Sequence, residues 1–177
     1  MLTEFTMEQF VDEVARLRGV IPARDDCSME LSTGSDIRQY LVSLIRNRYA
    51  RLLMEADPQL LPVGEFATRA TVTENAGDGS ATVILPSECV RPLSIRLAEW
   101  ATEAIVESYS HTLRSRQCNR YLRSGRTRPR AMTAPDGRSL RLWPGASGEV
   151  VSLRGVRQPE ENVIILDRSL ISQFQDL

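Results

Sequence analysis

The side chains with the clearest capacity for chemistry are the arginines between residues 114 and 130. This stretch contains seven arginines and no acidic residue: Arg114, Arg116, Arg120, Arg123, Arg126, Arg128 and Arg130. A guanidinium group is a planar fork of donors that matches the paired oxygens of a carboxylate or a phosphate. These seven arginines are therefore the predicted site, and the predicted chemistry is intermolecular contact with carboxylates or DNA phosphates.

The charge of the chain is divided along its length. Residues 108–148 carry a net charge of +8, whereas residues 1–107 carry −7 and residues 149–177 carry −2. The total of −1 therefore conceals a strongly basic segment between two acidic ones. All 22 basic residues are arginine, so every basic side chain is suited to bidentate contacts.

Three interpretations of the arginine segment stay open from the sequence. The side chains can form a solvated surface, bind nucleic-acid phosphates, or contact an acidic protein surface, including that of an identical neighbour. Proteins that bind single-stranded nucleic acid usually place several aromatic residues among the charges, and here only Tyr121 interrupts the run. This weakens the case for base stacking but not the case for contact with the phosphate backbone. In a ring around DNA, the arginines could both bind phosphates and contact an acidic neighbouring subunit.

The other reactive residues form no recognisable catalytic or metal-binding pattern. His111 is the single histidine and has no serine or cysteine partner at a recognisable spacing. Cys118 follows it in the sequence, but no further pair of ligands completes a metal site. The turns at Gly77-Asp78-Gly79 and Asp136-Gly137 lack the glycine spacing of a phosphate-binding loop. We expect no enzyme activity, no metal and no cofactor.

The bulk composition is typical of a soluble globular protein, with 42% hydrophobic and 25% charged residues in 177. No apolar run approaches the roughly 20 residues of a membrane span, so no membrane association is expected. The N-terminus lacks the pattern of a secretory signal. Cys27, Cys89 and Cys118 are widely spaced and fit reduced thiols better than a disulfide framework.

Residues 1–62 are predicted to form a helical region. Thr6 and Gln9 fit a capping box at the start of a first amphipathic helix. Ser35 can cap a second helix that runs to about Ala56. The apolar side chains of this second helix form a stripe typical of a core-facing surface: Ile37, Leu41, Leu44, Ile45, Leu52 and Leu53.

Residues 63–177 are predicted to be rich in antiparallel β-structure. The turn at Gly77-Asp78-Gly79 lies between two strand-like runs and indicates a hairpin. Residues 90–100 alternate apolar and polar side chains, as a strand does. Residues 104–106 either extend the sheet or belong to a helix that begins at Glu99.

Within this region, the arginine-rich segment 108–135 is predicted to begin as a helix at about Ser110. Leu113, Tyr121 and Leu122 are expected to point inward, and Gly125 to break the helix. Further strands are expected at about 140–142, 149–156 and 162–166, and Asp167 is expected to cap a terminal helical turn. The predicted fold class is α+β, an N-terminal helical pair packed with a small antiparallel β domain in one compact domain overall.

The order of these elements carries a family resemblance over about residues 35–170. The second helix ends in the run from Leu52 to Pro58, and the hairpin leads through Leu85-Pro86 into the alternating strand that ends at Trp100. Asn119-Arg120-Tyr121 and Arg128-Pro129-Arg130 follow. This succession resembles the head–tail adaptor (connector) proteins of tailed bacteriophages, which form a ring beneath the portal and join the capsid to the tail.

The resemblance implies a structural virion protein of the neck or tail, made in the host cytoplasm and without catalytic residues. It implies a homo-oligomeric ring, usually a dodecamer, whose partners are the portal protein, the tail proteins and the viral double-stranded DNA in the channel. The acidic and basic segments would supply complementary sides for such a ring. The alternative is an arginine-rich nucleic-acid-binding module that is not part of a virion, and a weaker rival is an enzyme with a concealed site.

Overall fold

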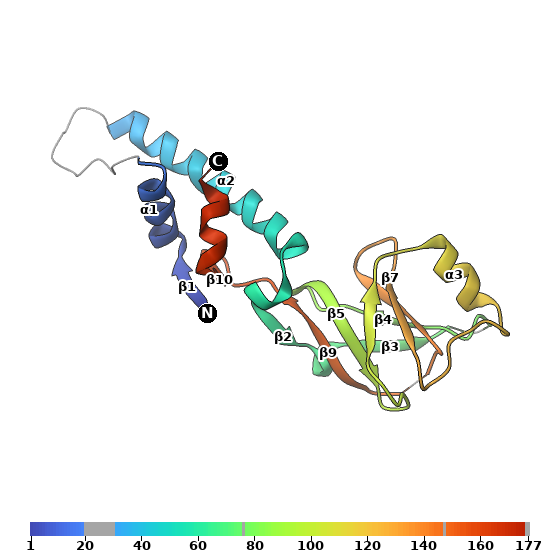
Figure 1. The fold of residues 1–177 in the computed structure, drawn as a ribbon. Helices are drawn as coiled ribbons and strands as arrows, with labels where there is room; N and C mark the ends of the chain where they lie inside the picture. Colours follow the sequence, from blue (N-terminus) through green and yellow to red (C-terminus); the bar gives the residue numbers. More distant parts are fainter. Residues whose placement is uncertain (20–30, 76, 147, 176–177) are drawn as a thin grey trace. The chain divides into compact units, whose positions relative to one another are not determined.

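The computed structural model describes residues 1–19, 31–75, 77–146 and 148–175. They fold into two compact units (Figure 1), each described by itself below. Unit 1 comprises residues 1–62 and 158–177, and unit 2 comprises residues 63–157. The fold is α+β, as predicted, with a two-stranded sheet in unit 1 and an eight-stranded sheet in unit 2.

Unit 1 is closed by the pairing of its two ends. The strand β1 (Leu2–Thr6) runs antiparallel to β10 (Val163–Asp167), with Leu2 opposite Asp167. This pairing places residues 158–177 in unit 1, whereas the predicted division includes them in the β-rich region 63–177. The strand β1 is absent from the predictions, because its apolar residues Leu2 and Phe5 lie on opposite faces and give no alternating apolar pattern.

The helix α1 (Met7–Leu17) begins at the predicted capping box. The Thr6 side chain accepts a hydrogen bond from the Gln9 backbone N–H at 3.2 Å, and the Gln9 side chain accepts one from the Thr6 N–H at 3.0 Å. Phe10 and Val14 are completely buried, and the Phe10 ring meets Phe174 edge to face at 4.9 Å. The helix is therefore held by its cap and by one packed face.

The helix α2 (Leu31–Glu55) extends further toward the N-terminus than the predicted cap at Ser35. Its buried face is formed by Ile45, Tyr49, Leu52 and Leu53. The stripe prediction is confirmed for the C-terminal half of the helix, whereas Leu41 and Leu44 are only half-buried. The side chain of Ile37 lies outside the described residues.

The Tyr49 side chain connects α2 to the strand β10 within unit 1. The Tyr49 hydroxyl donates to the Ile165 carbonyl at 2.9 Å and accepts from the Ile165 N–H at 3.1 Å. Burial raises the pKa of Tyr49 to about 12, although the bond to Ile165 acts in the opposite direction. A short 3-10 helix, η1 (Pro58–Leu60), follows α2. Another, η3 (Arg168–Phe174), begins at the predicted cap, because Asp167 accepts from the Ser169 N–H at 3.0 Å.

Unit 2 is organised around one sheet with the strand order β2-β9-β5-β6-β7-β8-β4-β3. The strands are β2 (Val63–Glu65), β3 (Thr71–Glu74), β4 (Ala81–Ile84), β5 (Cys89–Leu97), β6 (Ala104–Glu107), β7 (Arg130–Thr133), β8 (Ser139–Trp143) and β9 (Val150–Arg157), with the 3-10 turn η2 (Ala67–Arg69) between β2 and β3. The predicted strands at 90–100, 140–142 and 149–156 are confirmed as β5, β8 and β9.

The sheet is mixed, which corrects the prediction of a purely antiparallel domain. All neighbouring strands run antiparallel except β6 and β7, which are parallel. A parallel pair needs a crossover connection, and the helix α3 (His111–Cys118) lies in the segment that makes it. The arginine segment is therefore the crossover between two adjacent strands.

Two local predictions in unit 2 are confirmed. The strands β3 and β4 form the expected hairpin, with Thr71 opposite Ile84, and its turn places Gly77 and Gly79 at positive φ, where glycine is favoured. Residues 104–106 belong to β6, so the alternative of a helix from Glu99 is wrong.

The two faces of the sheet are covered differently. One face carries the main core, which includes Trp100, Ala131 and Leu142. Met132 and Trp143 are also completely buried but lie outside this cluster, because alternation along β7 and β8 turns them to the other face. The Ser110 N–H, at the start of α3, donates to the Met132 sulfur at 3.2 Å. Figure 1 shows α3 beside β7, and the bond to Met132 places the start of α3 on this second face.

The arginine segment as a candidate contact site

The helix α3 starts where the sequence predicts but ends early. The Ser110 hydroxyl accepts from the Leu113 N–H at 3.3 Å, so Ser110 is the N-cap, and the predicted start at about Ser110 is confirmed. At the other end, the Asn119 side-chain oxygen accepts from the Tyr121 N–H at 3.0 Å. Such a local bond from an asparagine competes with helix continuation, so the helix stops at Cys118, well before Gly125.

The early end of α3 makes the predicted orientation of two side chains wrong. Tyr121 is 82% exposed and Leu122 is 58% exposed. Both lie beyond the helix, so the helical period does not govern where they point. Leu113, inside the helix, is half-buried, as an inward-facing position should be.

The residue that sequence reasoning missed is Gln117, which is only 5% exposed. Its side-chain oxygen accepts from the Ser124 N–H at 2.8 Å, and its backbone carbonyl accepts from Arg123 Nε at 3.1 Å. These bonds tie the loop after α3 back to the helix. A glutamine surrounded by arginines gives no sequence signal of burial, although it lies one helical turn after Leu113, on the same face.

The Arg123 side chain points toward the β3–β4 turn of its own unit. Its guanidinium lies against Gly79, and a Cβ at Gly79 would overlap it. It also lies near Asp78, which forms an ion pair with Arg141 at 3.3 Å. Burial raises the pKa of Asp78, but hydrogen bonds from Ser80 and the charges of Arg141 and Arg123 outweigh burial and lower it.

Two further arginines of the segment have carboxylate partners that the fold supplies. Arg126 pairs with Glu99, and Arg130 pairs with Glu107. The second pair joins the end of β6 to the start of the neighbouring strand β7. Although the sequence has no acidic residue inside the segment, the topology therefore brings acids to it. We call Arg123, Arg126 and Arg130 the anchored arginines.

The other four arginines form no ion pair with any described residue. These unpaired arginines are Arg114, Arg116, Arg120 and Arg128, and all four are exposed. The Arg120 guanidinium lies 4.8 Å from the centre of the Tyr121 ring, a cation–π contact that leaves its outer donors accessible. Of the seven predicted contact residues, these four are the ones available to a partner.

The division of charge coincides with the division of the fold. Unit 1 contains eight arginines and fourteen acidic residues, a net charge of −6, and unit 2 contains fourteen arginines and nine acidic residues, a net charge of +5. The sequence pattern of acidic, basic and acidic segments thus becomes one acidic unit and one basic unit. The acidic C-terminal segment joins the acidic N-terminal one through the β1–β10 pair.

Other kinds of site find little support in the part of the chain that the structure describes. His111 and Cys118 are both exposed, and no group of three or more His, Cys, Asp or Glu side chains there is placed to hold a metal ion. None of the described helices combines the length and hydropathy that a bilayer span requires. No protein-family model and no curated protein matches the chain.

Proposed function

We propose that the chain is the subunit of a head–tail adaptor ring in a tailed bacteriophage. In this proposal about twelve copies form a ring beneath the portal, join the capsid to the tail and line or guide the genome channel. Each subunit packs its N-terminal helical pair with its β domain. The ring contacts the portal protein, the tail proteins and the viral DNA, and the protein works structurally, in the neck of a virion assembled in the host cytoplasm.

The observation that carries the proposal is the opposite charge of the two units. A ring built from one kind of subunit needs two different surfaces that complement each other, because the same contact repeats by rotation until the ring closes. A unit of net charge −6 and a unit of net charge +5 supply such surfaces. The order of elements, which resembles the adaptor family over about residues 35–170, gives the proposal its biological setting.

The unpaired arginines support the same proposal at the level of side chains. Arg114, Arg116 and Arg120 project from α3 and the turn that follows it, and none forms an ion pair with a described residue. Like charges at this density repel one another, and screening over about 8 Å at physiological salt makes distant carboxylates poor compensation. A neighbouring acidic unit or the phosphates of DNA in the channel would supply the missing negative charge.

A second candidate function is nucleic-acid binding outside a virion. The observation that favours it is the exposed Tyr121 ring beside Arg120, which together offer a stacking surface and phosphate donors. In that case the protein would act as a monomer. Its affinity for DNA would fall steeply with salt.

Mass and symmetry distinguish the two candidates. Native mass spectrometry and class averages of the purified protein, alone and with portal rings, should show a closed ring of about twelve copies, at the latest when portal is present. A stable monomer that never associates with portal would contradict the proposal. If that monomer also bound DNA in a salt-sensitive manner, the second candidate would replace the first.

A further inference from the structure

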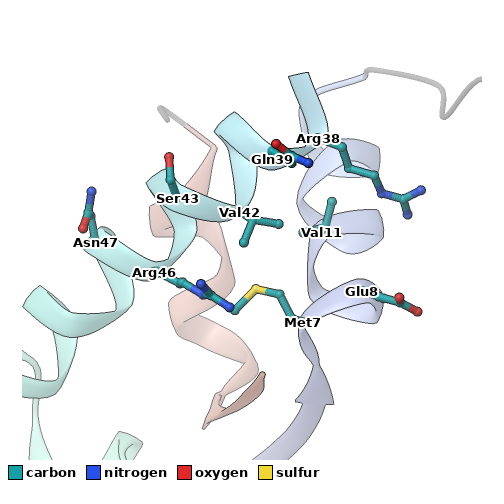
Figure 2. Close-up of a pocket in the computed structure, with 9 residues that line it drawn as sticks. All are labelled: Met7, Glu8, Val11, Arg38, Gln39, Val42, Ser43, Arg46 and Asn47. Atoms are coloured by element: carbon teal, nitrogen blue, oxygen red, sulfur yellow. The ribbon is translucent and has the colours of Figure 1, made fainter. Parts of the chain in front are cut away.

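A groove with an apolar floor lies in unit 1, between α1 and α2 (Figure 2), and we call it the α1–α2 groove. Its volume is about 740 Å³, within the roughly 300–1,000 Å³ of sites that bury most of a small ligand. Figure 2 shows Met7 and Val11 on α1 directed toward Val42 on α2. Met7 and Val42 are only half-buried, so apolar side chains of a partner would remove them from water.

Two arginines flank this floor. Arg38 precedes Val42 by four residues and Arg46 follows it by four, so all three lie on one face of α2. Figure 2 shows both arginine side chains extending toward α1, one on each side of Val42. The described lining includes one acidic residue, Glu8, and it points away from the floor. The groove therefore has positive charge at both ends of its floor.

The contacts of these arginines within the subunit leave much of their charge available. Arg46 donates to the Asn162 side-chain oxygen at 2.8 Å, and an amide carries no net charge. Arg38 pairs with Asp12 at 2.8 Å, but both side chains are well exposed, and exposed ion pairs are weak. A carboxylate brought by a partner would therefore find donors at both arginines.

The rest of α2 adds to this positive charge. Between positions 37 and 54 the helix has four arginines and no acidic residue. Screening limits electrostatic contacts to about 8 Å at physiological salt, so these nearby arginines matter more to an occupant than the net charge of −6 on the whole of unit 1. The groove therefore favours an occupant that carries carboxylates.

The walls of the groove determine the backbone form of that occupant. Both walls are helices, whose N–H and C=O groups bond within the helix, so neither wall offers a strand edge. A peptide that enters such a groove must satisfy its own backbone groups, as a helix does. The lining on α2 runs from residue 38 to residue 47, about 15 Å along the axis, which corresponds to roughly three turns of a partner helix.

We propose that the α1–α2 groove binds an amphipathic helix with acidic flanks, supplied by a partner protein. Apolar side chains of this helix, three and four residues apart, cover Met7 and Val42, and its Asp or Glu side chains reach Arg38 and Arg46. Nucleic acid would pair with the arginines but leave the apolar floor uncovered. The inference goes beyond the proposed ring, because it assigns a binding site within unit 1 that the ring does not use.

Selection from a display library of random peptides tests the inference. The peptides have about 16 residues, enough for roughly four helical turns, and the bait is the full chain. Peptides that also bind the Val42→Trp variant are removed, because this substitution fills the floor and leaves the arginines of unit 2 unchanged. Gln39→Trp, at an exposed lining position, takes its place if circular dichroism shows that Val42→Trp does not fold.

The retained peptides should be rich in Asp and Glu and carry apolar residues at helical spacing. In fluorescence anisotropy, such a peptide should bind the parent at least about tenfold more tightly than it binds Arg46→Glu. Arg51→Glu, on the same helix but outside the lining, is the control and should stay within about threefold of the parent. A peptide with lysine in place of each acidic residue should instead prefer Arg46→Glu to the parent.

Several results would overturn the inference. One is that no peptide remains after counter-selection with a folded variant, and another is that the remaining peptides have no excess of acidic residues. Equal losses in Arg46→Glu and Arg51→Glu would also contradict it. If Val42→Trp loses self-association or DNA binding that the parent shows, a second copy or nucleic acid is the occupant instead. A parent that binds these peptides but never associates with portal would support the inference and contradict the proposed function.

Discussion

The anchored and the unpaired arginines lie in one segment of the sequence but differ in what the fold gives them. Arg126 and Arg130 meet Glu99 and Glu107, and Arg123 lies against the β3–β4 turn. Arg114, Arg116, Arg120 and Arg128 meet no carboxylate in the described part of the chain. A dense run of like-charged residues is therefore not one functional unit, because the fold engages some of its arginines in contacts within the subunit.

The difference follows from where the two groups stand in the crossover between β6 and β7. The second half of the crossover returns to the sheet, so its arginines approach acids at the end of β6 and in the loop before it. The first half is α3 and the turn after it, whose inward positions are taken by Leu113 and Gln117. The arginines there remain on the outside, available to another molecule.

The largest effect on stability is expected at Gly79, in the β3–β4 turn that the anchored Arg123 contacts. Gly79→Ala should lower the free energy of unfolding by about 2–3 kcal/mol, because the residue has positive φ and its Cβ would displace Arg123 from its hydrogen bond. Urea denaturation of variant and parent measures this.

Gly137→Ala is the matched control for Gly79→Ala. Gly137 has φ +66°, close to the +61° of Gly79, but a Cβ there would meet nothing within 4 Å. This variant should therefore lose only the backbone contribution, about 1–2 kcal/mol. Equal losses at both glycines would mean that Arg123 is not anchored at the turn.

The next effect concerns Gln117, which ties the loop to α3. Gln117→Leu keeps a side chain of similar length but leaves the Ser124 N–H without its acceptor, so a loss of about 1–2 kcal/mol in unfolding free energy is expected. Thr112→Leu, at an exposed position of the same helix, should change stability by less than about 0.5 kcal/mol. If thermal melts show no difference between the two variants, the loop does not depend on the buried amide.

A smaller effect is expected for the exposed ion pairs. Arg126→Gln and Arg130→Gln should each lower the unfolding free energy by no more than about 1 kcal/mol, because exposed pairs are screened by solvent. High salt should reduce these losses. Losses that exceed this range and persist in high salt would show that the two ion pairs stabilise the fold more than exposed pairs usually do.

The smallest effect is a pH dependence at Asp78. Because its pKa is lowered in the folded protein from 3.8, Asp78 stabilises the fold at neutral pH, and this contribution is lost as the pH falls below 3.8 and through the lowered pKa. Arg123→Gln should raise the pKa of Asp78 measured by NMR, whereas Arg114→Gln should leave it unchanged. An equal response to both substitutions would remove the distinction between anchored and unpaired arginines.

The parts of the fold that sequence predicts are those with local causes. The capping box at Thr6, the start of α3 at about Ser110 and the β3–β4 turn each depend on residues close together in the chain, and all three predictions are confirmed. The parallel β6–β7 pair depends on a crossover, and the β1–β10 pair joins the two ends of the chain. No local pattern encodes either pairing, so neither is predicted.

The sequence locates the arginines of the candidate site, but it does not indicate which of them are anchored and which are unpaired. Charge along the sequence identifies all seven arginines, because composition alone locates a basic segment. Which of them pair with Glu99 and Glu107 depends on strand order, and the end of α3 depends on one Asn119 side-chain hydrogen bond. The exposure of Tyr121 and Leu122 follows from that helix end and reverses the sequence prediction.

The most direct test compares two triple variants that remove the same charge from unit 2. One replaces three unpaired arginines, Arg114→Gln, Arg116→Gln and Arg120→Gln. The other replaces three arginines that pair with acids in the structure, Arg69→Gln, Arg126→Gln and Arg130→Gln. The measurement is association with other copies and with portal rings by sedimentation over a salt series, after circular dichroism shows that both variants are folded.

The unpaired-arginine variant should associate at least about tenfold more weakly than the parent and show a shallower salt dependence. The paired-arginine variant should stay within about threefold of the parent, because its side chains already have partners within the subunit. Association and salt dependence that match the parent in both variants would show that the arginine segment is a solvated surface and contradict the proposed role of its charge.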